Sequence, residues 1–168
     1  RFVTNYISIL TERLDRTTRI LATAGYRDDI TGLTSPMTFP NAVEIETERV
    51  RRYGGRLAVV ILEVVSWREM LKSRGFAAID KAISILAQNI VSHLRCFDVM
   101  CRLDDWRFAV LLIHAGPEET AAVVRRLKGL SAKLMEEGLP PLTIAAGAAY
   151  YAAGVAPSAQ ELITYAIS

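Results

Sequence analysis

Residues 102–111 read RLDDWRFAVL, a segment that predicts two paired strands. An apolar run extends from Phe108 to Ile113, and a second strand pattern covers residues 98–102. Between the two runs, Asp104 and Asp105 provide residues that favour a tight turn. The pattern therefore predicts a β-hairpin with Trp106 at its turn.

Strand and helix patterns alternate on both sides of this hairpin. Residues 57–65 form a nearly continuous apolar run rich in β-branched side chains, which favours a buried central strand, and residues 142–150 predict another strand. Apolar spacing predicts helices at residues 37–52, 67–71, 78–94, 117–135 and 161–167. This order predicts an α+β fold, with helices flanking one mixed β-sheet.

The first 25 residues follow a different pattern. Apolar or small side chains repeat at alternating spacings of four and three, which is the seam of a heptad repeat: Val3, Ile7, Leu10, Leu14, Thr17 and Leu21. We therefore predict an N-terminal helical stalk at residues 1–25 and one domain at residues 26–168. Two roles remain open for the helix from Val3 to Leu21. It packs on its own domain, or it pairs with a second copy to form a homodimer.

Composition excludes several classes of protein. Of the 168 residues, 51% are hydrophobic and 23% charged, so the chain can bury a core. The net charge of +2 gives no reason to expect nucleic acid as a partner. No apolar stretch reaches the roughly 20 residues of a membrane helix. The chain begins at Arg1 rather than Met, so we expect a cytoplasmic piece of a longer protein, with any membrane anchor upstream. Cys96 and Cys101 alone predict neither a zinc site nor a disulfide framework.

Four motifs, in order, resemble the GGDEF domain of diguanylate cyclases. Residues 28–33 match the opening DxLTGL, and residues 52–54 match the RYG that precedes the first strand. Gly75 and Asp80 match two positions of GHxxGD, and residues 102–111 match RxGGDEFAVL. The resemblance implies a sheet like that of nucleotide cyclases. It also implies a hairpin turn that cradles GTP and acids that hold two magnesium ions.

The signature turn departs from the family at its chemical positions. Asp104 and Asp105 replace the two glycines that let the backbone approach GTP. Trp106 and Arg107 replace the two acids, and magnesium requires hard oxygen ligands. Without bound metal, the charge that develops on the transferred phosphoryl group is not neutralised. We therefore predict no catalytic residue, no metal and no cofactor, so that the chain is not an enzyme.

Other active-site positions of the family are only partly kept. Glu63 matches the acid of the first strand, but one carboxylate cannot hold two metal ions. Leu71 stands where the family has a guanine-binding Asn. Asp80 matches the second guanine contact, although an acid near the start of a helix has a local structural role as well.

A second nucleotide site of the family is matched in full. Residues 95–98 read RCFD, the RxxD signature of the inhibitory site, and five residues separate Asp98 from Asp104. The resemblance implies that Arg95 and Asp98 bind cyclic di-GMP, with Arg126 as a supporting arginine. An Arg fork matches O6 and N7 of guanine and also pairs with phosphate, and Asp accepts from guanine N–H groups. The alternative is a plain surface ion pair of Arg95 with Asp98.

These patterns predict a catalytically inactive GGDEF domain that acts as a cyclic di-GMP receptor in bacterial second-messenger signalling. The family implies control of exopolysaccharide export, biofilm formation or motility through an unidentified protein partner. The alternative is a pseudo-enzyme scaffold that binds no nucleotide and works by dimerising or by docking a partner. For Trp106 we leave open core packing, filling of the former GTP pocket, or contact with a partner.

Overall fold

The computed structural model describes residues 27–154 and 159–167. The predicted helix at residues 1–25, and any homodimer made through it, lie outside the described residues. The strands are β1 (Arg56–Val64), β2 (Val99–Arg102), β3 (Arg107–Ile113) and β4 (Ile144–Ala152). The helices are α2 (Phe39–Tyr53), α3 (Trp67–Arg74), α4 (Phe76–Val91), α5 (Pro117–Gly129), the 3₁₀ helix η1 (Leu130–Glu137) and α6 (Ala159–Ile167).

The four strands form one sheet in the order β2-β3-β1-β4, and each neighbouring pair is antiparallel. The predicted α+β fold with a helix-flanked sheet is confirmed. The prediction of mixed pairing is met, among the described residues, only by an isolated parallel bridge between Thr34 and Cys101. The β2–β3 hairpin explains the antiparallel pairing. The chain passes from β1 through α3 and α4 to the edge strand β2, and β3 then runs back between β2 and β1, antiparallel to both.

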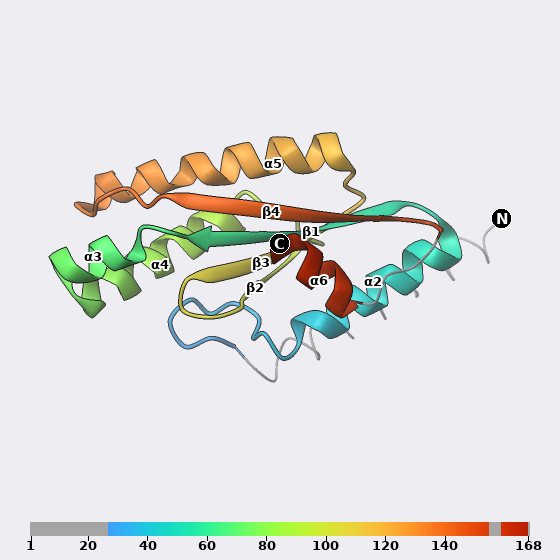
Figure 1. Cartoon of the computed structure of the whole chain (residues 1–168), viewed down its shortest axis with the longest axis horizontal. Coiled ribbons are helices and arrows are strands. Elements are labelled where there is room, and N and C mark those ends of the chain that lie inside the picture. The colour runs from blue at the N-terminus through green and yellow to red at the C-terminus, as the bar shows by residue number, and fades with distance from the viewer. Residues whose placement is uncertain (1–26, 155–158, 168) are drawn as a thin grey trace, which may run out of the picture.

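Strand β1 is apolar along nearly its whole length because both of its faces are covered. Alternate residues such as Val60 and Leu62 belong to a core cluster with α4, α5 and η1. The intervening residues, such as Val59 and Ile61, belong to a second cluster with α2 and α6. Figure 1 shows α5 along one side of the strands and α2 and α6 along the other. Glu63, near the end of the strand, is exposed.

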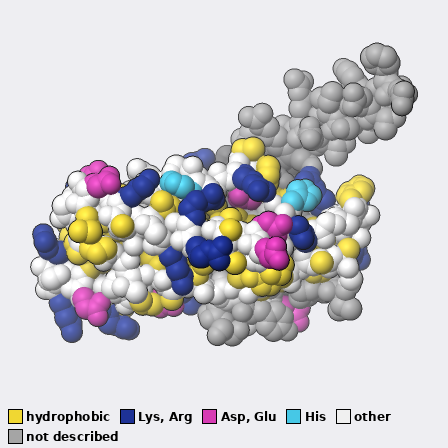
Figure 2. Space-filling view, turned by 90° about the horizontal axis from the view of Figure 1, so that it is seen from above, with side chains coloured by type: hydrophobic (Ala, Val, Ile, Leu, Met, Phe, Trp, Pro, Cys, Tyr) yellow, Lys and Arg dark blue, Asp and Glu magenta, His cyan; other side chains and the backbone are white. Residues whose placement is uncertain are grey.

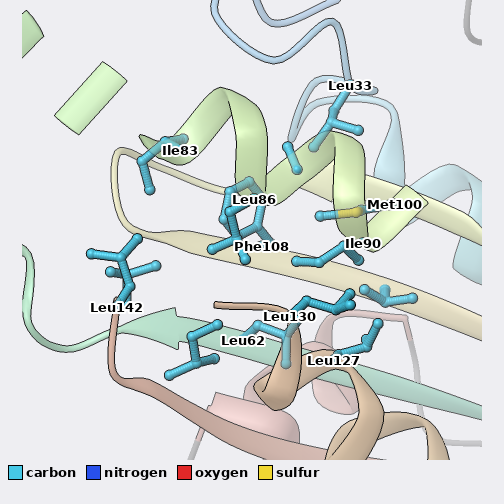
Figure 3. Packing of buried hydrophobic residues seen from close by; sticks show 14 of the residues in the cluster. Leu33, Leu62, Ile83, Leu86, Ile90, Met100, Phe108, Leu127, Leu130 and Leu142 are labelled. Carbon is cyan, nitrogen blue, oxygen red and sulfur yellow. The ribbon is translucent and has the colours of Figure 1, made fainter. Parts of the chain in front are cut away.

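The larger core cluster holds the hairpin against α4 and α5. Figure 3 shows Leu86 and Ile90 of α4 beside Phe108 of β3, with Leu62 and Leu127 nearby. All five side chains are buried. This packing fixes the base of the hairpin and the C-terminal half of α4, which are the two places where the sequence predicts functional chemistry.

One helix differs from the prediction. The pattern predicts a continuous helix over residues 117–135, whereas the α-helix ends at Gly129 and the chain continues as the 3₁₀ helix η1 to Glu137. Glycine is a weak helix former, so a change of helix type at Gly129 is physically reasonable. No helix within the described ranges is long and apolar enough to cross a bilayer.

Candidate functional site

The Arg95–Asp98 turn lies between α4 and β2, and two hydrogen bonds between its first and last residues stabilise it. The Arg95 backbone N–H donates to Asp98 Oδ2 at 2.9 Å, and the Asp98 N–H donates to the Arg95 carbonyl at 3.1 Å. Asp98 Oδ1 also accepts from the backbone N–H of Ile113 at 3.2 Å. Asp98 therefore shapes the turn that carries Arg95 and ties it to the end of β3.

Arg126 approaches the same turn from α5. Its Nη2 donates to the carbonyl oxygen of His93 at 2.7 Å, across 33 residues of sequence. Arg95 is exposed, and its guanidinium carbon lies 5.9 Å from the centre of the Phe97 ring. The three predicted site residues, Arg95, Asp98 and Arg126, thus belong to one turn and the helix packed beside it. Figure 2 shows Lys and Arg side chains gathered near the middle of the face that carries α5.

The hairpin turn holds its own ion pair. Asp104 Oδ2 accepts from Arg107 Nε at 2.7 Å and Nη2 at 2.6 Å, and Oδ1 accepts from the backbone N–H groups of Trp106 and Arg107. Burial alone would raise the pKa of Asp104, but these bonds and the charge of Arg107 hold it below its usual value. The same hydrogen bond and charge raise the pKa of Arg107.

Arg107 also faces the remaining acid of the first strand. In the β1–β3 ladder, Glu63 and Arg107 are directly opposite each other, a relation that brings side chains on one sheet face into contact range. A guanidinium group, and not a second carboxylate, is therefore the cross-strand neighbour of Glu63. Within residues 27–154 and 159–167, no group of three or more His, Cys, Asp or Glu side chains is placed to hold a metal ion.

Trp106 packs on Trp67 at the start of α3. The two rings are parallel, with centroids 4.1 Å apart and planes inclined by 3°. The guanidinium carbon of Arg68 lies 4.6 Å from the centre of the Trp67 ring. Both tryptophans are partly buried against the larger core cluster. Core packing is therefore the role that the geometry supports for Trp106.

A buried arginine, Arg102, holds the backbone of the hairpin turn by hydrogen bonds. Arg102 is only 7% exposed, and its Nη1 contacts both carboxylate oxygens of Asp28 at 3.2 and 3.1 Å. Its remaining nitrogens donate to the carbonyl oxygens of Asp104 and Asp105 at 3.1 and 3.3 Å. The sequence motifs contain both Asp28 and Arg102, but their separation of 74 residues conceals that they are partners.

The fold and these motifs agree with a comparison of sequences. A model of the family described as "Diguanylate cyclase, GGDEF domain" matches residues 25–167. The chain therefore belongs to the GGDEF family of diguanylate cyclase domains, a class of proteins of bacterial cyclic di-GMP signalling.

Individual relatives are more distant. The chain is 29% identical over 101 residues to the diguanylate cyclase DgcP of Pseudomonas aeruginosa, a match that covers 60% of this chain and 15% of DgcP. This chain therefore spans only a small part of the length of DgcP.

Solved structures share the fold, and two of them serve as examples. The GGDEF domain of DgcB from Caulobacter crescentus, in complex with c-di-GMP, has a TM-score of 0.75 at 15% identity, covering 84% of this chain and 82% of that one. Diguanylate cyclase SiaD of Pseudomonas aeruginosa, in complex with its activator SiaC, has a TM-score of 0.75 at 20% identity, covering 98% and 65%. At these identities the likeness concerns the fold alone.

Proposed function

We propose that this chain is a catalytically inactive GGDEF domain that binds cyclic di-GMP through Arg95, Asp98 and Arg126. The observation that carries the proposal is the hydrogen bond from Arg126 to the carbonyl oxygen of His93. It joins α5 to the turn that presents Arg95, so that two cations from distant parts of the sequence belong to one surface. The DgcB domain, which has the same fold, was solved in complex with c-di-GMP, and this supports the choice of ligand.

The side chains suit the chemistry of this ligand. Cyclic di-GMP has two phosphates and two guanine bases, and an Arg fork pairs with phosphate or with O6 and N7 of guanine. The exposed guanidinium of Arg95 is available for such a contact. Asp98 already accepts two backbone N–H groups, but a carboxylate has about four acceptor sites. Acceptor capacity thus remains for a guanine N–H.

The hairpin supports the loss of cyclase chemistry. The Asp104 carboxylate is engaged by Arg107, and Arg107 also faces Glu63 across the ladder. The donor set does not suit a pair of magnesium ions, which require several oxygen ligands and few nearby cations. Trp106, stacked on Trp67, provides no ligand oxygen at the position of a family acid. No step through magnesium is therefore assigned to this chain.

Isothermal titration calorimetry with cyclic di-GMP tests the binding site. Wild type is expected to bind in the micromolar range, and Arg95→Ala and Arg126→Ala are each expected to weaken binding by about 5-fold to 150-fold, as for the loss of a charge-assisted bidentate contact of about 1–3 kcal/mol. Arg125→Ala is the matched control, because Arg125 is exposed and adjacent in α5. Its affinity should stay within about threefold of wild type.

Two results would decide against this site. Absence of binding at several hundred micromolar ligand would reject the receptor function and favour the scaffold alternative. Equal losses in Arg125→Ala and Arg126→Ala would show a general effect of charge and not a specific site.

A turnover assay tests the second half of the proposal. The chain, incubated with GTP and magnesium, is expected to form no cyclic di-GMP, as measured by chromatography with an active diguanylate cyclase as positive control. Product formation by wild type, lost on Glu63→Gln, would mean that the hairpin retains catalysis and that the proposed inactivity is wrong.

A further inference from the structure

Glu119 is an anion at the start of α5 with two defined bonds. Its Oε2 accepts from the backbone N–H of Gly116 at 3.0 Å, which satisfies the N–H of the residue that precedes the helix. Its Oε1 accepts from Arg56 Nη2 at 2.7 Å, across 63 residues of sequence. Both side chains of this ion pair are about half exposed.

The side of α5 that carries Glu119 also carries Arg126. Residues 119, 123 and 126 follow the spacing of four and three that places side chains on one helix face. Val123 packs against the larger core cluster, and Arg126 bonds to the carbonyl of His93. Seven residues of helix correspond to a rise of about 10 Å, so Glu119 lies within reach of the field of the proposed ligand site.

Arg95 is near enough to Glu119 for its positive charge to act on the carboxylate. Asp98 ties the Arg95 turn to the N–H of Ile113, and Gly116, whose N–H Glu119 holds, follows three residues later. The pKa of Glu119 is lowered first by backbone N–H groups, its own and that of Gly116, and then by the positive charges of Arg56 and Arg95. On the face that carries α5, Figure 2 shows Asp and Glu side chains beside the gathered Lys and Arg side chains.

We propose that Glu119 is a built-in counter-anion that limits the affinity of this surface for the phosphates of cyclic di-GMP. Its carboxylate forms an ion pair with Arg56 and interacts electrostatically with Arg95. A phosphate that approaches these arginines is therefore repelled by the negative charge of Glu119. This inference rests on the proposed function, because it concerns the regulation of the same ligand site. It identifies Glu119 as a residue that tunes affinity and that lies outside the RxxD motif.

The change that tests the inference is Glu119→Gln. Glutamine keeps an oxygen that can accept from the Gly116 N–H, so this hydrogen bond is retained while the negative charge is lost. At this range of distances and at low salt, removing one like charge is expected to tighten binding about threefold to tenfold. Glu118→Gln is the matched control, since Glu118 is exposed in the same first turn, and it should stay within about twofold of wild type.

The experiment is calorimetric titration of cyclic di-GMP into the full chain for wild type, Glu119→Gln and Glu118→Gln. Each titration is repeated at low and high NaCl. The gain in Glu119→Gln should shrink at high salt, a readout that a purely structural role in capping would not produce. Thermal unfolding of the three proteins checks that the cap is intact.

The outcomes separate the two claims. If wild type binds and Glu119→Gln binds no tighter, or if Glu118→Gln gains as much, the counter-anion role is wrong and the receptor function stands. If neither wild type nor Glu119→Gln binds, the proposed function fails and this inference fails with it.

Discussion

Trp67 and Trp106 stack in parallel with their ring centroids 4.1 Å apart. Trp67 begins α3 and Trp106 lies in the hairpin turn. The stack therefore joins two segments between which α4 and β2 lie in the sequence. In this chain the Trp106 ring of the turn stacks on a side chain of the same domain, so the contribution of this contact to folding can be measured.

Removing either ring should destabilise the domain. Trp106→Ala is expected to lower the free energy of unfolding by about 1–3 kcal/mol, because apolar burial and the stack are lost together. Trp67→Ala should behave similarly. The measurement is urea denaturation, with circular dichroism as the signal for unfolding.

The double-mutant cycle isolates the stack itself. The coupling energy between Trp67→Ala and Trp106→Ala should be about 0.5–1.5 kcal/mol. Additive effects of the two changes, with coupling near zero, would mean that the rings contribute only by separate burial.

Gly147 of β4 is required by a close approach of α6. A Cβ atom at this position would overlap the carbonyl oxygen of Ala166. Gly147→Ala is therefore expected to lower the free energy of unfolding by about 1–3 kcal/mol. Gly129→Ala is the control, because Gly129 has right-handed helical φ and ψ and open space around it. That change should be neutral or stabilising by up to about 1 kcal/mol, and a larger loss in Gly129→Ala than in Gly147→Ala would contradict the packing.

Asp28 should make stability depend on acid pH. Burial by itself would raise its pKa, but hydrogen bonds from Thr31 and the charge and hydrogen bond of Arg102 bring it below its ordinary value of 3.8. A carboxylate with a lowered folded-state pKa stabilises the domain fully above the unfolded value and loses that effect as pH falls through the folded one. Stability of wild type is thus expected to decline below about pH 4.

Asp28→Asn tests this dependence. At neutral pH the variant should lose about 2–3 kcal/mol, since the buried Arg102 loses its carboxylate partner. Between neutral and acid pH its stability should then fall less steeply than that of wild type. Asp104 and Glu119 have pKa values lowered as well, so the decline is reduced and not abolished. Parallel pH curves for the two proteins would argue against the assignment to Asp28.

Substitutions of Asp98 and Arg95 should differ in their effect on stability, although both should weaken ligand binding. Asp98→Ala removes the acceptor of two backbone N–H groups and is expected to cost about 1–2 kcal/mol of unfolding free energy. Arg95→Ala keeps the backbone N–H that Asp98 accepts and should change stability by less than about 0.5 kcal/mol. Both variants are expected to bind cyclic di-GMP weakly. Equal stability of the two would show that the Asp98 bonds contribute little to holding the turn.

The element types follow from local sequence for clear reasons. The continuous apolar run at residues 57–65 predicts a strand that is buried on both faces. The structure has β1 at Arg56–Val64, and most of its residues are buried. The hairpin is predicted from the turn residues between two strand patterns, and β2 and β3 pair on either side of Asp104 and Asp105. The end of the α-helix at Gly129 was missed, because a single glycine within a helical pattern does not determine where the helix changes type.

The order of helices and strands, the membership of the GGDEF family and the replaced residues of the signature turn can all be read from the amino-acid sequence. These depend on short periodic patterns and motif spacings, which are local properties of the chain. The partners among distant residues become visible only in the folded chain: Arg126 with His93, Arg102 with Asp28, Trp106 with Trp67, and Arg56 with Glu119. Such pairs depend on the strand order β2-β3-β1-β4 and on helix packing across both sheet faces, and no local pattern encodes that arrangement.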